Sequence, residues 1–145
     1  MILVPLVVDQ VDVPVVAAGG IADRRGFRAA LALGAQGVQL GTRFLASEES
    51  PASQAWKKAI LECGDGGTMR IPQGPMTVRV IINPKLKALA DDPQADLSKE
   101  YNLANGYKAW STGDFDLFPA GGGQVSALIK EIKPVKDIIE ELVAE

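Results

Sequence analysis

The chain has 145 residues, with 15 Lys and Arg against 18 Asp and Glu, and a formal net charge of −3. This composition, 47% apolar and 23% charged, is typical of a globular protein and excludes a disordered or collagen-like chain. The charge gives no reason to expect nucleic acid or an anionic membrane as a partner. The absence of histidine excludes imidazole chemistry within this chain, and the single cysteine, Cys63, excludes an internal disulfide framework.

No apolar stretch is long enough to span a bilayer. The first eight residues are apolar but lack the basic region of a signal peptide. We therefore expect a cytoplasmic protein.

Two short apolar strands are predicted, at residues 13–18 and 37–40. A glycine turn follows each strand, Gly19-Gly20 after the first and Gly41 after the second. The first strand is apolar on both faces, which is typical of a parallel sheet and requires a neighbouring strand on each side. A short helix between the two strands completes one βαβ unit.

The rest of the chain is predicted to be mostly helical. Ser50-Pro51 is a plausible start for a helix that ends at Gly64. Residues 64–76 are rich in glycine and proline and favour a loop, and residues 77–82 favour a strand. Two further helices are expected in the first part of the chain: a buried one within residues 3–11, and one capped by Asp23 and ended by Gly34. Two are expected in the middle, one beginning at Asn83-Pro84 and one through Tyr101 and Tyr107. The last two are one through Val125, Leu128 and Ile132 and one after Pro134, with Ile138 and Leu142 on its apolar face.

The two glycine turns carry the strongest chemical signal. A phosphate needs backbone N–H groups that it can approach without side chains in the way, and glycine provides that approach. In a (β/α)8 barrel the loops after strands 7 and 8 converge on one phosphate site, and two consecutive strands with glycine turns fit that geometry. Thr42 would add a hydroxyl and Arg43 a charge. The alternative is that the glycines make tight βα turns and nothing more.

Four other features favour structural roles. Asp114 and Asp116 resemble a carboxylate pair, but with no third ligand nearby a solvated turn is favoured over a metal site. Cys63 lies on an apolar helical face, which favours a buried structural thiol over a nucleophile. Arg24 and Arg25 are expected in solvent. The aromatic residues Tyr101, Tyr107 and Trp110 are expected to serve in packing.

Residues 13–23 (VPVVAAGGIAD) and 33–44 (LGAQGVQLGTRF) resemble the nitronate monooxygenase family, formerly the 2-nitropropane dioxygenases. They are also similar to the related flavin-dependent enoyl-ACP reductases. Further matches are the segment from Arg79 to Asn83 and the late Gly122-Gly123-Gln124 turn. The resemblance extends over nearly the whole chain and is weakest at residues 64–110.

The resemblance implies an α/β fold, the C-terminal part of a (β/α)8 TIM-type barrel with an appended, mostly helical small domain. Residues 1–50 would be the last βα units of a flavin-binding barrel, residues 51–120 the small domain or insertion, and residues 121–145 the C-terminal helices that return to the barrel. The expected partners are a missing N-terminal barrel half or a second chain, and the protein is expected to form a homo-oligomer.

The resemblance also implies non-covalent binding of FMN. Gln39 would face the barrel interior near the cofactor. Gln124 would hydrogen-bond over the flavin, or would be no more than the first residue of a helix. The residues that the resemblance assigns to the FMN phosphate are Gly19, Gly20, Gly41 and Thr42.

The implied activity is the oxidation of an alkyl nitronate, a small-molecule substrate, by dioxygen. The family's catalytic histidine has no counterpart among these 145 residues, so the chain would provide the phosphate site and not the base. Enoyl-ACP reduction, a non-redox phosphate-binding barrel and a fragment that only assembles are the alternatives.

Overall fold

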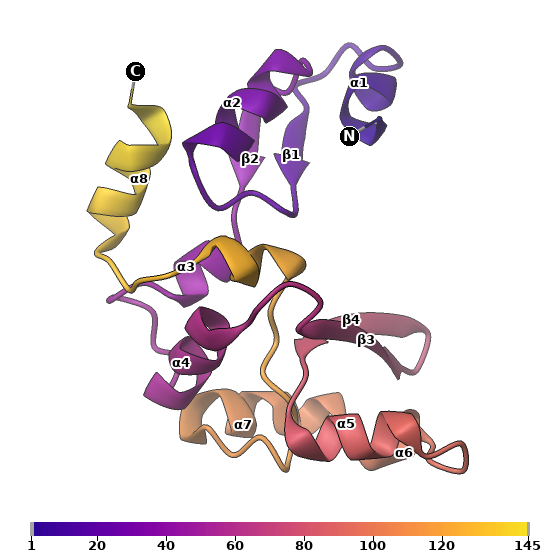
Figure 1. Ribbon diagram of the computed structural model, residues 1–145. Helices are drawn as coiled ribbons and strands as arrows, with labels where there is room; N and C mark the ends of the chain where they lie inside the picture. The colour runs from indigo at the N-terminus through magenta and orange to yellow at the C-terminus, as the bar shows by residue number, and fades with distance from the viewer. Residues whose placement is uncertain (1, 145) are drawn as a thin grey trace.

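Figure 1 shows the computed structural model, in which residues 2–144 are described. The fold is α/β, with two separate two-stranded sheets in that range. No helix within residues 2–144 is long and apolar enough to cross a membrane. The elements in chain order are α1 (Leu3–Val8), β1 (Val16–Ala18), α2 (Arg24–Ala32), β2 (Gly37–Gln39), α3 (Thr42–Leu45), α4 (Gln54–Glu62), β3 (Thr68–Gln73), β4 (Met76–Ile81), α5 (Pro84–Asp91), α6 (Leu97–Glu100), the 3-10 helix η1 (Leu103–Asn105), α7 (Gly106–Thr112), the 3-10 helix η2 (Gln124–Leu128) and α8 (Val135–Val143).

The predicted βαβ unit is confirmed. Strands β1 and β2 pair in parallel, with Ala17 opposite Val38. Helix α2 covers one face of the pair, where Ala17 and Ala30 belong to a small buried cluster against which Val38 packs. Gly34 ends α2 with a φ of +95°, a left-handed conformation that favours glycine.

The first helix, α1, is not buried by the rest of residues 2–144, so the prediction of a buried helix is wrong. Leu3 and Leu6 of α1 are 70% and 55% exposed, and Val16 of β1 is 57% exposed. The reason is that α2 covers only one side of a sheet with two strands, so that the other apolar surfaces have nothing to pack against. The sequence correctly predicted that the first strand is apolar on both faces. Burial also requires neighbouring elements, which residues 2–144 do not provide.

The larger core lies in the second half of the chain. It combines residues of α4, the β3–β4 hairpin, α5 and α7 with others from the segments between them. Its buried members are Ala46, Ala52, Trp56, Ile60, Cys63, Ile71, Val80, Ile81, Leu86, Tyr101, Ala109, Phe118, Ala120 and Ile129.

Strand β3 lies where a loop was expected, within residues 64–76, and β4 confirms the strand predicted at residues 77–82. The two strands pair from Thr68 opposite Ile81 to Gln73 opposite Met76, and the two-residue turn is Gly74-Pro75. Gly74 has a φ of +59°, as the first position of a type II′ hairpin turn requires. The glycine and proline content suggested a loop, but Ile71 is fully buried in the larger core and this packing stabilises the strand.

Three helix boundaries also differ from expectation. Helix α4 begins after Ser53, whose hydroxyl accepts a hydrogen bond from the Trp56 N–H, and not at Ser50-Pro51. Tyr101, expected within a helix, lies between α6 and η1 and is fully buried. The helix expected through Val125 and Leu128 is a short 3-10 helix, in which Leu128 is 54% exposed.

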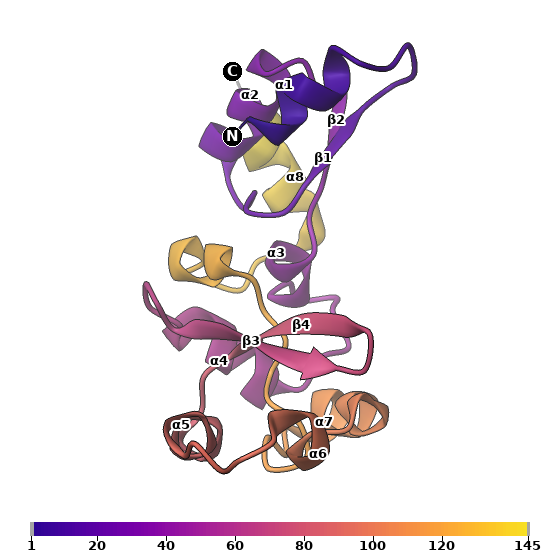
Figure 2. The same ribbon diagram turned by 90° about the vertical axis from the view of Figure 1, so that its right-hand side faces the viewer.

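Helix α8 follows Pro134 as predicted, with Ile138 and Leu142 buried. Figure 1 shows α8 beside α2, at the end of the molecule that holds the β1–β2 pair. Both views place α3 near the middle of the molecule, and α5, α6 and α7 at the opposite end (Figure 2). The C-terminal segment therefore passes from the larger core back to the βαβ unit.

Candidate functional site

The two glycine turns lie at one edge of the β1–β2 pair. Because Ala18 pairs with Gln39 in a parallel register, the chain leaves both strands on the same side. Gly19-Gly20 and Gly41-Thr42 therefore emerge next to each other, and we call this side the glycine edge. The structure brings together the four residues that the sequence assigned to a phosphate.

The Gly19-Gly20 turn has an open backbone. The two glycines have φ values of +95° and +74°, and no heavy atom lies within 4 Å of the position that a Cβ would take at either one. A cleft of about 330 Å³ lies at this turn and is lined by residues of α1, β1 and α2. A ligand can approach the backbone here without displacing a side chain.

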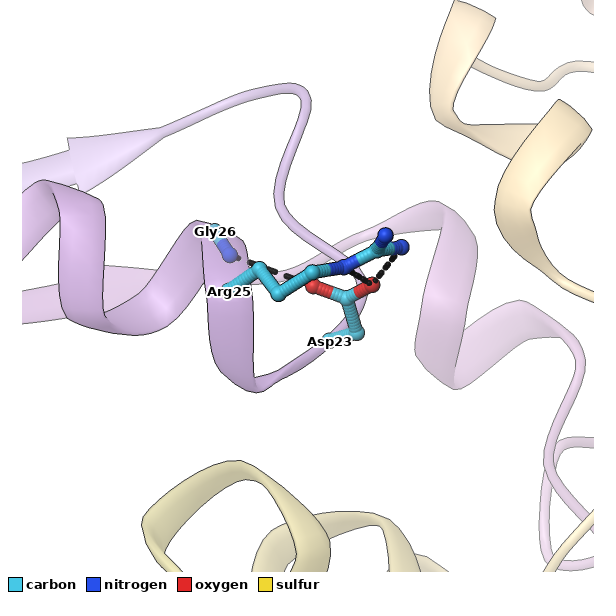
Figure 3. A network of polar contacts seen from close by, with 3 residues as sticks. All are labelled: Asp23, Arg25 and Gly26. Atoms are coloured by element: carbon cyan, nitrogen blue, oxygen red, sulfur yellow. Dashed lines mark hydrogen bonds and ion pairs between the residues drawn. The ribbon is translucent and has the colours of Figure 1, made fainter.

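Asp23 holds the end of this turn against α2 (Figure 3). Its Oδ1 accepts a hydrogen bond of 3.1 Å from the Gly26 N–H, and its Oδ2 accepts one of 2.9 Å from Arg25 Nε. The hydrogen bond from Arg25 is the main cause that holds the pKa of the Asp23 carboxyl below its ordinary value. The predicted N-cap is confirmed, and Arg25 is exposed as expected.

The second turn leads directly into α3. Gly41 precedes this helix with a φ of −100°, and no heavy atom lies within 4 Å of where its Cβ would be. The Leu45 N–H donates to the Gly41 carbonyl oxygen at 3.0 Å. The amides before Leu45 in the first turn have no acceptor within the helix, as at any helix N-terminus, and they face the end at which Gly41 lies.

Arg43 does not add its charge to the glycine edge, and the expectation that it would is wrong. Its side chain is 6% exposed, and Nη1 donates a hydrogen bond of 3.0 Å to the Glu131 carbonyl oxygen. Burial lowers the pKa of the guanidinium, while nearby Glu131 and Glu141 partly oppose that shift. Arg43 thus fastens α3 to the segment that leads to α8.

Thr42 joins the glycine edge to the late glycine turn. Its Oγ1 accepts a hydrogen bond of 3.0 Å from the Gly123 N–H, 81 positions later in the chain. The hydroxyl proton of Thr42 is not used in this bond. Gln124 follows directly as the exposed first residue of η2, next to Gly123.

The late glycine turn is closely packed. A Cβ on Gly122 would lie 3.0 Å from Ile81 Cδ1 and 3.1 Å from Ser126 Oγ. Ser126 is fully buried, and its hydroxyl donates to the Gly123 carbonyl oxygen at 2.8 Å. These contacts fix the Gly122-Gly123 turn, and the hydrogen bond from Gly123 to Thr42 joins the turn to the glycine edge.

Gln39 lies on the face of the sheet opposite α2. Ala17 and Val38 pack toward α2, and side chains alternate along a strand, so Ala18 and Gln39 face the other way. Both are exposed in this structure.

Sequence reasoning missed two residues that support the site. Lys57 is 3% exposed, and its Nζ donates to the Ser47 and Glu48 carbonyl oxygens at 2.6 and 3.2 Å. Trp56 Nε1 donates to the Gly121 carbonyl oxygen at 3.1 Å. The residues around Lys57 in the sequence give no sign of the two carbonyls that it contacts, because these are reached only in the folded chain.

The weaker candidates behave as structural residues. Asp114 Oδ1 accepts from the Asp116 N–H at 3.1 Å in an exposed turn, and residues 2–144 contain no group of three or more potential metal ligands. Cys63 is free and buried, and burial raises the pKa of its thiol. Both predictions, a solvated turn and a buried thiol, are confirmed.

The sequence profile of the nitronate monooxygenase family matches residues 1–145. The chain is an α/β protein with two glycine turns at one sheet edge, and it belongs to the nitronate monooxygenase family.

Individual relatives agree with this assignment. The chain is 36% identical to a nitronate monooxygenase of Neurospora crassa, over 97% of this chain and 41% of the relative. A probable nitronate monooxygenase of Staphylococcus saprophyticus is 56% identical over 69 residues, which are 48% of this chain and 19% of that protein.

Two solved structures share the fold. FabK from Thermotoga maritima aligns with a TM-score of 0.84 and 37% identity, over 98% of this chain and 47% of its own. Nitroalkane oxidase from Streptomyces ansochromogenes aligns with a TM-score of 0.76 and 31% identity, over 99% of this chain and 42% of its own. The chain thus spans less than half the length of these structures, and 41% of the Neurospora relative.

Proposed function

We propose that this chain is the flavin-phosphate part of an FMN-dependent oxidoreductase that oxidises alkyl nitronates with dioxygen. The observation that carries the proposal is the glycine edge, where two open glycine turns and the Thr42 hydroxyl meet beside the late glycine turn. Membership of the nitronate monooxygenase family supports the reaction.

The residues present fit a phosphate. The backbone at Gly19, Gly20 and Gly41 is open to approach, because the space beyond each Cα is free of heavy atoms to 4 Å. The Thr42 hydroxyl has its proton left to donate after accepting from Gly123. Backbone N–H groups and a hydroxyl are suitable donors for a phosphate dianion.

Other residues of the site would orient the rest of the cofactor. Gln39 lies on the sheet face away from α2, which is the interior face in a β/α barrel. Gln124 lies beside Thr42 through the Gly123 hydrogen bond. When bound, FMN would supply the redox chemistry, and the protein would hold and orient it.

This proposal includes the domain organisation. Residues 1–50 would be the last βα units of a (β/α)8 barrel, residues 51–120 a small appended domain, and residues 121–145 a return to the barrel. The exposed apolar surface of α1 and β1 supports a further barrel surface packed against it, from an N-terminal half or a second chain.

The test is a visible absorption spectrum followed by FMN titration of Gly41→Glu. Glutamate at this position would put bulk and a negative charge beside the phosphate, and affinity should fall at least about tenfold. The variant should fold normally, because Gly41 has a negative φ and open space beyond it. Gly41→Gln, which adds similar bulk without charge, is the matched control for electrostatic repulsion. Unchanged FMN affinity in Gly41→Glu would place the phosphate elsewhere.

The second candidate is the enoyl-ACP reduction that the related flavin enzymes carry out. The similarity of residues 13–23 and 33–44 to the flavin-dependent enoyl-ACP reductases favours keeping it. Anaerobic reduction of the bound flavin by a nicotinamide cofactor would support this candidate, whereas flavin reduction by a nitronate would support the first.

A further inference from the structure

Two arginines lie side by side on the β3–β4 hairpin. Arg70 pairs directly with Arg79 in the antiparallel register. Side chains at such positions share one face of the hairpin, with Cβ atoms about 4.5–5.5 Å apart, and like charges placed there are destabilising. The ion pairs formed within residues 2–144 include neither arginine, so no carboxylate in that range offsets the repulsion.

At Arg70 and Arg79 the arginine face lies opposite the face that packs on α5 and α7, whereas further along the same face Ile81 is buried in the larger core. Ile71 and Val80, the next residues along each strand, are fully buried in that core with residues of α5 and α7. Because side chains alternate along a strand, Arg70 and Arg79 leave the opposite face. Figures 1 and 2 show the hairpin between the layer of α5, α6 and α7 and the βαβ unit. In both views α3 and η2 lie between the hairpin and the βαβ unit.

Arg79 is already held in place. Its Nη1 donates a hydrogen bond of 3.0 Å to Thr68 Oγ1 on the same face, and the residue is half-buried. Its carbonyl oxygen accepts from the Gly122 N–H at 3.4 Å, next to Gly123, which donates to Thr42. The backbone of Arg79 is thus bound to the same short segment that contacts the glycine edge.

We propose that Arg70 and Arg79 together bind the anionic head group of the substrate. This inference rests on the proposed function, because it identifies that anion as a nitronate. A nitronate is planar with two oxygens that share one negative charge, and a guanidinium matches such a pair with two parallel N–H donors. A bound anion would also offset the repulsion between the two arginines and would therefore stabilise the pair.

The experiment measures the affinity of the protein loaded with pre-reduced flavin for propyl-2-nitronate by calorimetry without oxygen, so that the nitronate cannot transfer electrons to the flavin. Arg70→Met and Arg79→Met keep an apolar side chain and remove the charge. Each should raise the dissociation constant about tenfold or more. Arg79→Lys keeps the charge but loses the paired donors, and should fall between Arg79→Met and the parent. Lys87→Met removes an exposed positive charge from α5 and should leave the affinity unchanged.

A second ligand separates a site for the anion from an effect on the whole pocket. Neutral 2-nitropropane has no anionic head, so its affinity should be similar in the parent and in both methionine variants. An equal loss of affinity for the neutral and anionic forms would overturn the proposal. So would a nitronate affinity that the arginine substitutions leave unchanged while flavin binding is normal.

Failure of this inference can be told from failure of the proposed function. If the parent binds flavin but the arginine variants bind nitronate as tightly, only the inference is wrong. If the parent binds no flavin, the proposed function fails, and titration with acetate tests the arginine pair as an anion site by itself. In that case, acetate binding that is lost in both methionine variants would support the pair, and binding equal in all variants would overturn it.

Discussion

The Thr42 hydroxyl accepts a hydrogen bond of 3.0 Å from the backbone N–H of Gly123, across 81 positions of sequence. Gly122, the residue before, donates to the Arg79 carbonyl oxygen, so one short segment contacts both the glycine edge and the hairpin. Both of these contacts involve backbone groups of the segment. The position of the Gly122-Gly123 segment therefore depends little on its own side chains and strongly on its close packing against its neighbours.

Thr42→Ala should lower the free energy of unfolding by about 1 kcal/mol, because the part-buried Gly123 N–H loses its acceptor. Thr42→Ser retains the hydroxyl and should remain close to the parent. Urea denaturation of the three proteins measures the difference. Equal stability of the alanine and serine variants would mean that the hydrogen bond contributes nothing.

Lys57→Met should destabilise the fold by about 1–3 kcal/mol, since it leaves the Ser47 and Glu48 carbonyls without their donor. The adjacent Lys58 provides a matched control. Its side chain is 72% exposed and pairs with Glu62 at 3.6 Å, so Lys58→Met should change stability by less than about 1 kcal/mol. Thermal or chemical denaturation of both variants checks this, and a similar effect of the two substitutions would contradict it.

Gly113→Ala should cost at least about 2 kcal/mol of stability. Gly113 ends α7 with a φ of +77°, and a Cβ there would lie 2.6 Å from the Ala55 Cβ. Gly64→Ala is the control, because Gly64 has open space beyond its Cα and is not among the glycines with positive φ. Its stability should be unchanged or slightly raised. Denaturation curves in which both variants match the parent would show that the Gly113 site relaxes freely.

The contribution of Asp23 should depend on pH. The pKa of its carboxyl is lowered in the fold, mainly by the hydrogen bond from Arg25, so the ionised form stabilises the folded state. This stabilisation is present above the carboxyl's ordinary pKa and is lost as pH falls through the lowered value. Asp23→Asn retains an oxygen acceptor for the Gly26 N–H but does not titrate. The stability difference between parent and variant should be constant near neutral pH and shrink in acid, as measured by urea denaturation across the range. A difference independent of pH would contradict the role of the charge.

Much of the βαβ unit was predictable, because its signals act over short distances in sequence. The Asp23 side chain caps a helix that begins at the next residue, and Gly34 ends the same helix through its own backbone conformation. The parallel pairing of β1 and β2 follows from one short crossover helix. Strand β4 falls on the predicted strand at residues 77–82. Strand β3 was missed because proline and glycine at residues 72–75 suggested a loop, whereas the burial of Ile71 against distant residues stabilises a strand there.

The glycine turns, the helix caps and the likeness to the nitronate monooxygenases are evident from the sequence, because each depends on residues that are contiguous in the chain. The contact of Arg43 with the Glu131 carbonyl, the burial of Lys57 and the hydrogen bond from Gly123 to Thr42 are evident only in the folded chain. Each of these contacts joins a helical residue to the backbone of a separate segment outside the helices and strands. A hydrogen bond of this kind forms only after packing has excluded water and brought donor and acceptor together, so the local pattern around each residue contains no record of its partner.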